Sequence, residues 1–402
     1  MSRLAVGAHV VVCAMLLTSC VSDGEPTLSA PSASAAPSEA ESPDTRGAQE
    51  PASSVETFDP SAFAAVRDEP IPKPTATELD DLLVQYAEGF GMTATVMSPA
   101  GTWSGATGMA DTSHSLRPTD QFAIGSITKS VFAAQVMRLV ETGDVALDDP
   151  VADHLPPNLD FDTNGATIRQ LLSMTSGIPD YVDALWRSLS TDRERRWTTA
   201  ELLDLVRPKR TRPGKRWEYS STNYILLQLM VEHVRGRRAS EVLRHGVLSG
   251  PGLERMAFQP DERPSGPVAT SDAGRHGLFA EGGGYLPSLA GATAAQAAGG
   301  IASDSATLAR WWTQFCGGEI VSPVSLKKMA AHPDPSEEYA LGLLVKAGSA
   351  EPASLGMYGV HVGFSTWASC YADGVVVVAL SNQEEADPFW LAEALAAAIR
   401  EK

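Results

Sequence analysis

The sequence predicts an α/β fold of the α+β kind, in which an antiparallel sheet combines strands from both ends of the folded chain and is flanked by helices. Strand patterns occur early, at Met92 to Ser98 and Thr102 to Met109. They return late, at Ala340 to Lys346, Val360 to Tyr371 and Val375 to Ser381. The stretch between these groups has mostly helical patterns. We therefore expect a mostly helical second lobe, with the active site between the two lobes.

Residues 1 to 19 have the pattern of a signal peptide. Arg3 is followed by an apolar run from Leu4 to Leu17, which is too short to span a bilayer. Leu17-Thr18-Ser19-Cys20 resembles a bacterial lipobox, which implies cleavage before Cys20 and a lipid on its thiol. We expect export to the outer face of the cell membrane, with membrane contact through the lipid alone. Ordinary secretion is the alternative.

Residues 20 to 57 are expected to form a lipid-anchored disordered linker. The stretch from 21 to 56 has no aromatic residue and consists mainly of Ser, Ala, Pro and acidic residues. Such a composition buries too little apolar surface to offset the entropy of the chain. The folded domain should therefore extend from residue 58 to residue 402.

The charge balance and the spacing of Cys and His exclude some partners and cofactors. The chain has 31 Lys and Arg against 49 Asp and Glu, a formal net charge of −18, so nucleic acid is not an expected partner. The Cys spacing fits no zinc pattern and no His pair has H-E-x-x-H spacing, so we expect neither metal nor cofactor. We expect a monomer.

The domain should begin with a helix and a hairpin. Thr75-Ala76-Thr77-Glu78 has the pattern of a capping box that opens a helix through about Gly89. Pro99-Ala100-Gly101 then separates the two early strand patterns as a turn.

The next helix, within Phe122 to Gly143, is apolar on most sides and should be buried. Ser126 and Lys129 are three residues apart, so on a helix their Cβ atoms lie roughly 5 to 6 Å from each other. A desolvated Lys129 would lose its proton readily and activate the Ser126 hydroxyl. Alternatively, Ser126 only caps a core helix and Lys129 reaches solvent.

The same S-x-x-K spacing recurs at Ser325 to Lys328. This copy follows Pro323 and places Lys327 beside Lys328, a pattern that predicts a helix start with a solvated basic face. We therefore expect no catalysis at Ser325.

Helical patterns fill the middle of the chain. Ile168 to Met174 and Ile225 to Gly236 have helical spacing, and Thr198 with Glu201 forms another capping box. Residues 259 to 300 are rich in Gly, Ala and Ser, so we expect loops over a cleft there.

The last third should contain a helix, a hairpin and a final helix. Ser303 to Phe315 has a helical pattern, and Ala372-Asp373-Gly374 is a strong hairpin signal before the unbroken apolar run Val375 to Leu380, which predicts a central strand. Asp387-Pro388 should start the last helix. We expect five of its side chains to cover the sheet: Phe389, Trp390, Leu391, Leu395 and Ile399.

Two further features concern thiols and charge. Cys316 and Cys370 are expected to form a disulfide, because Cys316 ends a helix that should cover the strand carrying Cys370.

The segment from Trp186 to Trp217 contains ten basic residues against four acids. It is either a solvated face or a landing surface for an anionic cell-wall polymer.

In this order, the motifs resemble the superfamily of serine beta-lactamases and penicillin-binding D-Ala-D-Ala carboxypeptidases, particularly the class C type with its related serine esterases. The resemblance covers nearly everything from about residue 60. It rests on six stretches: Phe122 to Lys129, Leu139 to Gly143 with Leu147 to Pro150, Leu171 to Gly177, Pro213-Gly214 before Tyr219-Ser220-Ser221, Ala298 to Ser303, and Gly363-Phe364-Ser365.

The resemblance implies a set of roles. Ser126 would be acylated, Lys129 would assist, and Tyr219 would relay a proton to the leaving group. Two backbone N–H groups, those of Ser126 and Val360, would form the oxyanion hole.

The chain departs from the family pattern at the substrate-binding positions. Ser221 stands where relatives have Asn, and Met357-Tyr358-Gly359 occupies the place of the Lys/His-Thr-Gly triplet. Met174 replaces a His that is common before Thr-Ser-Gly. His361, expected on the same strand face as Met357 and Gly359, is a candidate replacement for the missing cation, or else a structural residue.

These observations predict an extracytoplasmic serine hydrolase that forms an acyl-enzyme on Ser126 and acts on a small ester, amide or peptide. The alternatives are a catalytically degenerate binding protein on this scaffold and a structural envelope lipoprotein. The absence of G-x-S-x-G argues against an α/β-hydrolase.

Overall fold

The computed structural model describes residues 58–182, 184–185, 194–206, 210–259, 261–271, 284–331, 338–348 and 352–401. All of them belong to one compact unit. The predicted signal peptide, Cys20 and the linker lie outside the described residues. None of the helices in the described ranges has the length and apolar character that crossing a membrane requires.

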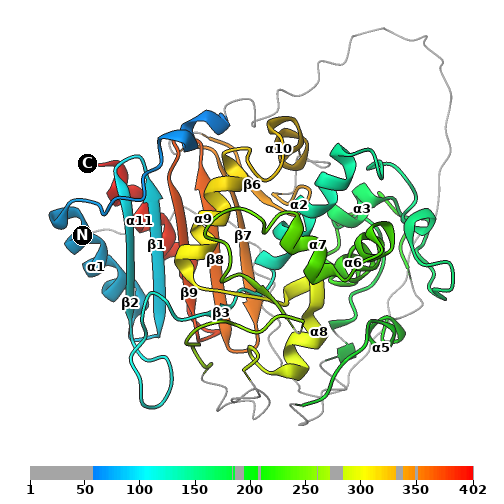
Figure 1. The fold of residues 1–402 in the computed structure, drawn as a ribbon, viewed down its shortest axis with the longest axis horizontal. Helices are drawn as coiled ribbons and strands as arrows, with labels where there is room; N and C mark the ends of the chain where they lie inside the picture. The colour runs from blue at the N-terminus through cyan, green and yellow to red at the C-terminus, as the bar shows by residue number, and fades with distance from the viewer. Residues whose placement is uncertain are drawn as a thin grey trace, which may run out of the picture. The chain divides into compact units, whose positions relative to one another are not determined.

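One six-stranded sheet joins the two ends of the domain (Figure 1). All neighbouring strands are antiparallel, and β9 lies between the early and late strands with every residue buried. This confirms the predicted sheet, but the strand predicted from Ala340 to Lys346 covers only Leu344–Lys346. The strands, in spatial order, are β2 (Gly101–Thr107), β1 (Met92–Ser98), β9 (Val376–Ser381), β8 (Phe364–Tyr371), β7 (Ser354–His361) and β6 (Leu344–Lys346).

The prediction of one strand from Val360 to Tyr371 is wrong. The chain turns at Val362-Gly363, where Gly363 has φ +75°, so β7 and β8 form an antiparallel hairpin. The pattern missed β7 because Gly356 and Gly359 interrupt it, and Gly is a poor strand former. At Gly359 the fold requires a Gly, since any Cβ would collide with the carbonyl of Ile124.

Helices cover both faces of this sheet. On one face, α1 (Lys73–Ala87) and α11 (Pro388–Arg400) pack together, and on the other lies α9 (Ser305–Cys316). The start of α11 after Asp387 is confirmed, since the Asp387 carboxylate accepts from Phe389 N. Trp390, however, is 56% exposed and does not cover the sheet.

The predicted capping box at Thr75 is also wrong. Helix α1 already begins at Lys73, and Pro72 precedes it without a side-chain cap. Pro74 fits the first turn because a Pro lacks the N–H that has no partner there.

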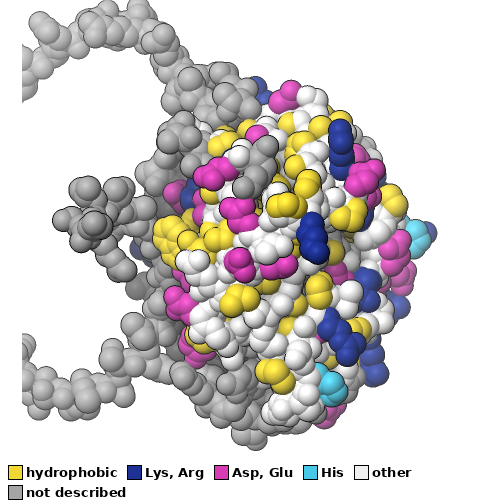
Figure 2. Space-filling model, turned by 90° about the vertical axis from the view of Figure 1, so that its left-hand side faces the viewer, with side chains coloured by type: hydrophobic (Ala, Val, Ile, Leu, Met, Phe, Trp, Pro, Cys, Tyr) yellow, Lys and Arg dark blue, Asp and Glu magenta, His cyan; other side chains and the backbone are white. Residues whose placement is uncertain are grey.

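In Figure 2, which turns the left-hand side of Figure 1 toward the viewer, acidic, basic and apolar side chains mix over the described surface.

The second lobe is mostly helical, as predicted. It contains α2 (Ile127–Glu141), α3 (Ile168–Leu172), α5 (Thr199–Asp204), α6 (Thr222–Arg235), α7 (Ala239–His245), α8 (Leu289–Gly299) and α10 (Pro323–Ala330), with 3-10 helix η2 (Val151–His154) and a small sheet of β3 (Phe122–Ala123), β5 (Ile301–Ser303) and β4 (Ala257–Phe258); η1 (Pro60–Ala65) precedes α1.

Details of this lobe confirm two predictions and correct one. The Thr198 and Glu201 capping box is present at the start of α5. The expectation of loops alone for residues 259 to 300 is wrong, because α8 forms there behind an N-cap bond from Gly291 N to Ser288 Oγ. Helix α2 is buried on nearly all sides, as its composition predicted.

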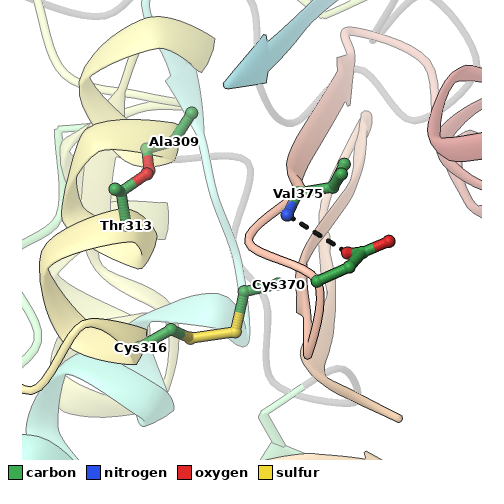
Figure 3. The surroundings of a disulfide bond; sticks show 6 residues. Ala309, Thr313, Cys316, Cys370 and Val375 are labelled. Atoms are coloured by element: carbon green, nitrogen blue, oxygen red, sulfur yellow. Dashed lines mark hydrogen bonds between the residues drawn. A yellow bond between two sulfur atoms is a disulfide. The ribbon is translucent and has the colours of Figure 1, made fainter. Parts of the chain in front are cut away.

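A disulfide joins helix α9 to the six-stranded sheet. Cys316 at the end of α9 is bonded to Cys370 on β8, and both side chains are buried (Figure 3). The link therefore ties the helix that covers the sheet to the strand beneath it.

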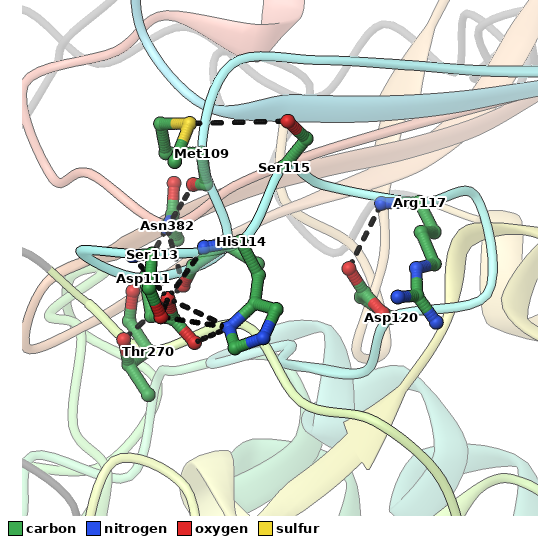
Figure 4. A network of polar contacts seen from close by, with 10 residues as sticks. Met109, Asp111, Ser113, His114, Ser115, Arg117, Asp120, Thr270 and Asn382 are labelled. Atoms are coloured by element: carbon green, nitrogen blue, oxygen red, sulfur yellow. Dashed lines mark hydrogen bonds and ion pairs between the residues drawn. The ribbon is translucent and has the colours of Figure 1, made fainter.

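The loop between β2 and β3 is held by polar contacts (Figure 4). Asp111 accepts from Ser113 N at 2.6 Å and pairs with His114 at 3.0 Å, contacts that hold the pKa of its carboxyl below the usual range. Asn382 donates to the carbonyls of Met109 and Thr270 at 3.0 and 2.8 Å. This fixes the loop to the end of β9.

Candidate active site

Ser126 lies at the start of α2, behind a tight turn. Gly125 has φ +53°, and a Cβ there would come within 2.7 to 2.8 Å of the Val360 backbone. Only a Gly allows this approach, which brings β7 against the first turn of α2. Ser126 is partly exposed and occupies the N-cap position, yet its side chain makes no capping bond. Its hydroxyl therefore remains available to other groups.

Lys129 is buried beneath that hydroxyl. Only 1% of it is exposed, and its Nζ donates to Ser126 Oγ at 3.1 Å and to the Ala298 carbonyl at 2.7 Å. Burial lowers the pKa of Lys129 to about 7, and the negative charge of Asp180 partly opposes this shift. Near neutral pH a large share of Lys129 is thus an uncharged amine that can accept a proton.

Tyr219 makes the second contact with the nucleophile. Its hydroxyl donates to Ser126 Oγ at 2.8 Å, and Lys129 Nζ lies 4.9 Å from the centre of its ring. The segment before α6 that carries Tyr219 is anchored by a bond from Glu218 N to the Met174 carbonyl at 2.8 Å. The structure thus brings the three predicted catalytic side chains together.

Further aromatic rings surround this trio. Tyr339 packs edge-on against Tyr219 at 6.3 Å between ring centres, and Trp217 lies 6.2 Å from Tyr219. Tyr224 lies beneath, with its ring centre 5.7 Å from Lys129 Nζ. Burial raises the pKa of Tyr224 and Tyr339 far above neutrality, so both stay protonated. The rings exclude water from Lys129 and thereby sustain its low pKa.

The predicted second oxyanion donor, Val360, lies on the open edge of β7. Strand β6 pairs only with residues 354 to 356 of β7, so the edge beyond Gly356 is left to face Gly125. Thr366 of β8 donates to the Ile124 carbonyl at 2.9 Å and fixes the turn before Ser126 to the sheet. The backbone of Val360 is thereby held next to the nucleophile turn.

The Met357-Tyr358-Gly359 triplet does not act as a unit. Met357 is 3% exposed and packs into the core shared with α2. Tyr358 points to the opposite face of the sheet, against Trp367, where burial raises its pKa to about 12. The prediction that Tyr358 contacts substrate is therefore wrong, because successive residues of a strand face opposite sides.

His361 is held in its neutral form at neutral pH. Its Nδ1 accepts from Val362 N at 2.9 Å, which leaves the ring proton on Nε2. Burial lowers the pKa of His361 to about 4, and the charge of Lys129 contributes to the lowering. His361 consequently does not replace the cation that Met357 lacks, and its Nε2 is buried.

Two other departures from the family pattern are accommodated locally. Ser221 is 6% exposed and precedes α6 without capping it. Met174 has φ +59°, and its sulfur accepts from Ser220 N at 3.4 Å and from Asn223 Nδ2 at 3.5 Å. The Met174 sulfur is thus the hydrogen-bond acceptor for these two donors.

The second S-x-x-K copy lies at the start of α10, as predicted. Ser325 N donates to Ser322 Oγ at 3.2 Å, and Lys327 and Lys328 are exposed.

The segment from Trp186 to Trp217 is only partly described, but Arg195, Arg210 and Arg216 in it pair with acids of this domain.

Sequence patterns missed the groups that surround Lys129. The Ala298 carbonyl and Asp180 approach it only through tertiary folding, and a backbone carbonyl leaves no mark in a sequence. Within the described ranges, no group of three or more His, Cys, Asp or Glu is arranged to hold a metal ion.

Comparison with known proteins gives consistent matches. The sequence model of the family described as Beta-lactamase matches residues 79–401. A protein of Bacillus subtilis (strain 168) named as a penicillin-binding protein, PbpX, is 26% identical over 279 residues. That match covers 68% of this chain and 65% of PbpX, so the chain spans slightly less than two thirds of that relative.

Solved structures have the same fold. D-amino acid amidase from Ochrobactrum anthropi SV3, complexed with D-phenylalanine, has a TM-score of 0.68 at 22% identity, covering 82% of this chain and 100% of its own. D-stereospecific amidohydrolase from Streptomyces sp. has a TM-score of 0.67 at 23% identity, with coverages of 80% and 98%. At such identities the likeness establishes the fold alone.

Proposed function

Since the chain belongs to the Beta-lactamase family, we propose that it is a serine hydrolase that works through an acyl-enzyme on Ser126. The observation that carries this proposal is the pair of contacts on Ser126 Oγ, at 3.1 Å from Lys129 Nζ and 2.8 Å from the Tyr219 hydroxyl. A Ser that served only as a helix cap would need neither contact.

In the proposed acylation, neutral Lys129 takes the proton of Ser126 as Oγ attacks the substrate carbonyl. The carbonyl oxygen becomes an oxyanion, which the N–H groups of Ser126 and Val360 stabilise. Tyr219 relays this proton from Lys129 to the leaving alcohol or amine as the bond to the leaving group breaks, so Lys129 is neutral and Tyr219 is protonated again. A water then attacks the ester on Ser126 while Lys129 takes a proton from it, and this proton returns to Ser126 Oγ as the acid is released.

The residues at the predicted carboxylate-binding positions carry no positive charge, which favours substrates without a carboxylate. Met357 is apolar and His361 is neutral, so neither supplies the cation that would hold a carboxylate. Removing a charged hydrogen bond of about 1.5 to 3 kcal/mol weakens binding roughly ten- to a hundredfold. We therefore propose small neutral or amine-bearing esters and amides, and the names of the amidases with this fold support that class.

Fluorophosphonate labelling tests the proposal. Wild-type protein should be labelled and should hydrolyse a small activated ester faster than a carboxylate-bearing beta-lactam. Ser126→Ala should lose both activities, while Ser325→Ala, the matched control in the second S-x-x-K copy, should keep them. A wild type that takes no label and hydrolyses no ester or amide of the panel would leave the binding-protein alternative in its place.

We also propose that the protein is exported and anchored through a lipid on Cys20, on the pattern of its first twenty residues. Metabolic labelling with a clickable fatty acid should mark the wild type and not Cys20→Ala. Labelling of neither protein would favour plain secretion.

A further inference from the structure

We propose that Gln228 of α6 is a positioning residue. It holds a break in α8 so that the Ala298 carbonyl keeps the Lys129 amine against Ser126. This inference rests on the proposed function, because it concerns the base of that reaction.

Helix α8 is broken at Gln296. The residue has φ +41° and ψ −134°, values that belong to the first central position of a II′ turn, where Gly is the usual residue. Gln296 is nevertheless a buried side chain with Ala on both sides. A conformation that a side chain disfavours persists only where its surroundings impose it.

The break redirects the last turn of α8, which carries Ala298 and ends at Gly299. Gly300 N donates to the Gln296 carbonyl at 2.7 Å, a helical bond that caps the single turn after the break. In a continued helix the Ala298 carbonyl would accept from residue 302, but Ala302 lies in β5 and pairs with Ala123 and Ala257. The Ala298 carbonyl therefore has no helical partner and accepts from Lys129 at 2.7 Å.

Two side chains of the helical lobe hold the broken turn. Gln228 Oε1 accepts from Ala297 N at 3.0 Å, in a buried contact. The other end of its amide bonds the Glu232 carboxylate on the same helix, which fixes which amide atom faces α8. Thr199 of α5 donates to Gln296 Oε1 at 3.0 Å.

The held carbonyl affects Lys129 in two ways. It orients the amine, whose other contact is Ser126 Oγ at 3.1 Å. As a hydrogen-bond acceptor it also favours the charged form, so it opposes the effect of burial on the pKa of Lys129. Releasing the carbonyl should let the amine move and should lower its pKa further.

The experiment measures the rate constant of fluorophosphonate labelling between pH 5 and 9, kcat and KM for a small neutral ester, and thermal melting. Gln228→Leu removes the acceptor for Ala297 N, whereas the double variant Gln228→Glu with Glu232→Gln keeps an acceptor oxygen for Ala297 N and exchanges donor and acceptor between residues 228 and 232. Gln314→Leu is the matched control, because Gln314 is a buried glutamine of α9 that bonds the Pro251 carbonyl instead.

We expect Gln228→Leu to reduce kcat and labelling at pH 8 at least tenfold, with little change in KM, and to shift the acid limb of the profile to lower pH. The double variant Gln228→Glu with Glu232→Gln should keep most of the wild-type rate. Gln314→Leu should lower the melting temperature and leave the profile unchanged. A purely structural role of Gln228 would move melting without moving the acid limb.

A folded Gln228→Leu variant with the wild-type rate and acid limb overturns the inference while leaving the proposed function intact. If that variant does not fold, Thr199→Val provides the test, with a smaller change in the same direction. An unchanged profile in Thr199→Val then overturns the inference. A wild type that cannot be labelled overturns the proposed function itself, and this inference with it.

Discussion

Lowering the pH through neutrality should slow acylation of Ser126, because the amine that takes the Ser126 proton must be uncharged. Burial lowers the pKa of Lys129 from 10.5 to about 7, against a smaller opposing effect from Asp180. The uncharged form of a Lys is the deprotonated one. Activity that depends on it is therefore present above pH 7 and is lost as the pH falls through that value.

The size of the effect follows from the titration. With the pKa of Lys129 at about 7, roughly nine-tenths of the amine is neutral at pH 8 and about one hundredth at pH 5. Acylation should thus fall roughly ninetyfold between these pH values. With an ordinary lysine pKa of 10.5, only about one amine in 3,000 would be neutral at pH 7. The rate would then still rise about tenfold per pH unit between pH 7 and pH 9.

The assay is kcat/KM for a neutral activated ester from pH 5 to 9, with melting curves at each pH to verify folding. Asp180→Asn provides a second perturbation. It removes the charge that raises the pKa of Lys129, so the acid limb should move to lower pH. A rate that keeps climbing steeply above pH 8, or an Asp180→Asn limb displaced upward, would refute Lys129 as the buried neutral base.

Three more outcomes follow from the structure. Met357→Lys should raise kcat/KM for a carboxylate-bearing beta-lactam roughly ten- to a hundredfold while leaving a neutral ester unaffected, and an equal change for both substrates contradicts the charge argument. Tyr219→Phe keeps the ring over Lys129 but should lower kcat about a hundredfold or more, with melting unchanged; retention of half the rate would exclude Tyr219 as the proton relay. Replacing Cys316 and Cys370 together by Ser opens a link across 54 residues and should cost about 4 kcal/mol in urea unfolding, whereas a loss below about 1 kcal/mol would mean that packing alone holds α9 to β8.

Much of the fold could be predicted because its signals are local. The unbroken apolar run in β9 indicated a central strand, and the Thr198 capping box marked the start of α5. Failures occurred where local preference and final structure disagree. Strand β7 contains Gly359, which weakens a strand pattern but is required by its contact with the Ile124 backbone. Helix α8 was missed because its Gly and Ala residues have no amphipathic spacing, since the helix is buried on nearly all sides.

The sequence by itself determined which residues are available for the chemistry. A spacing of three on an apolar helix places Ser126 and Lys129 side by side, since that relation depends only on helical geometry. It also determined which groups are missing, because Met357 has neither charge nor donor wherever it lies.

Only the tertiary structure decided the state and surroundings of those residues. The low pKa of Lys129, the arrival of Tyr219 at Ser126, the neutrality of His361 and the Ala298 carbonyl on Lys129 all depend on burial and on contacts between distant segments. The orientation of Tyr358 away from the site depended on the register of β7, which one residue of slip would have reversed. Such properties depend on the dielectric surroundings and on backbone atoms that every residue shares, so no pattern of side chains specifies them in advance.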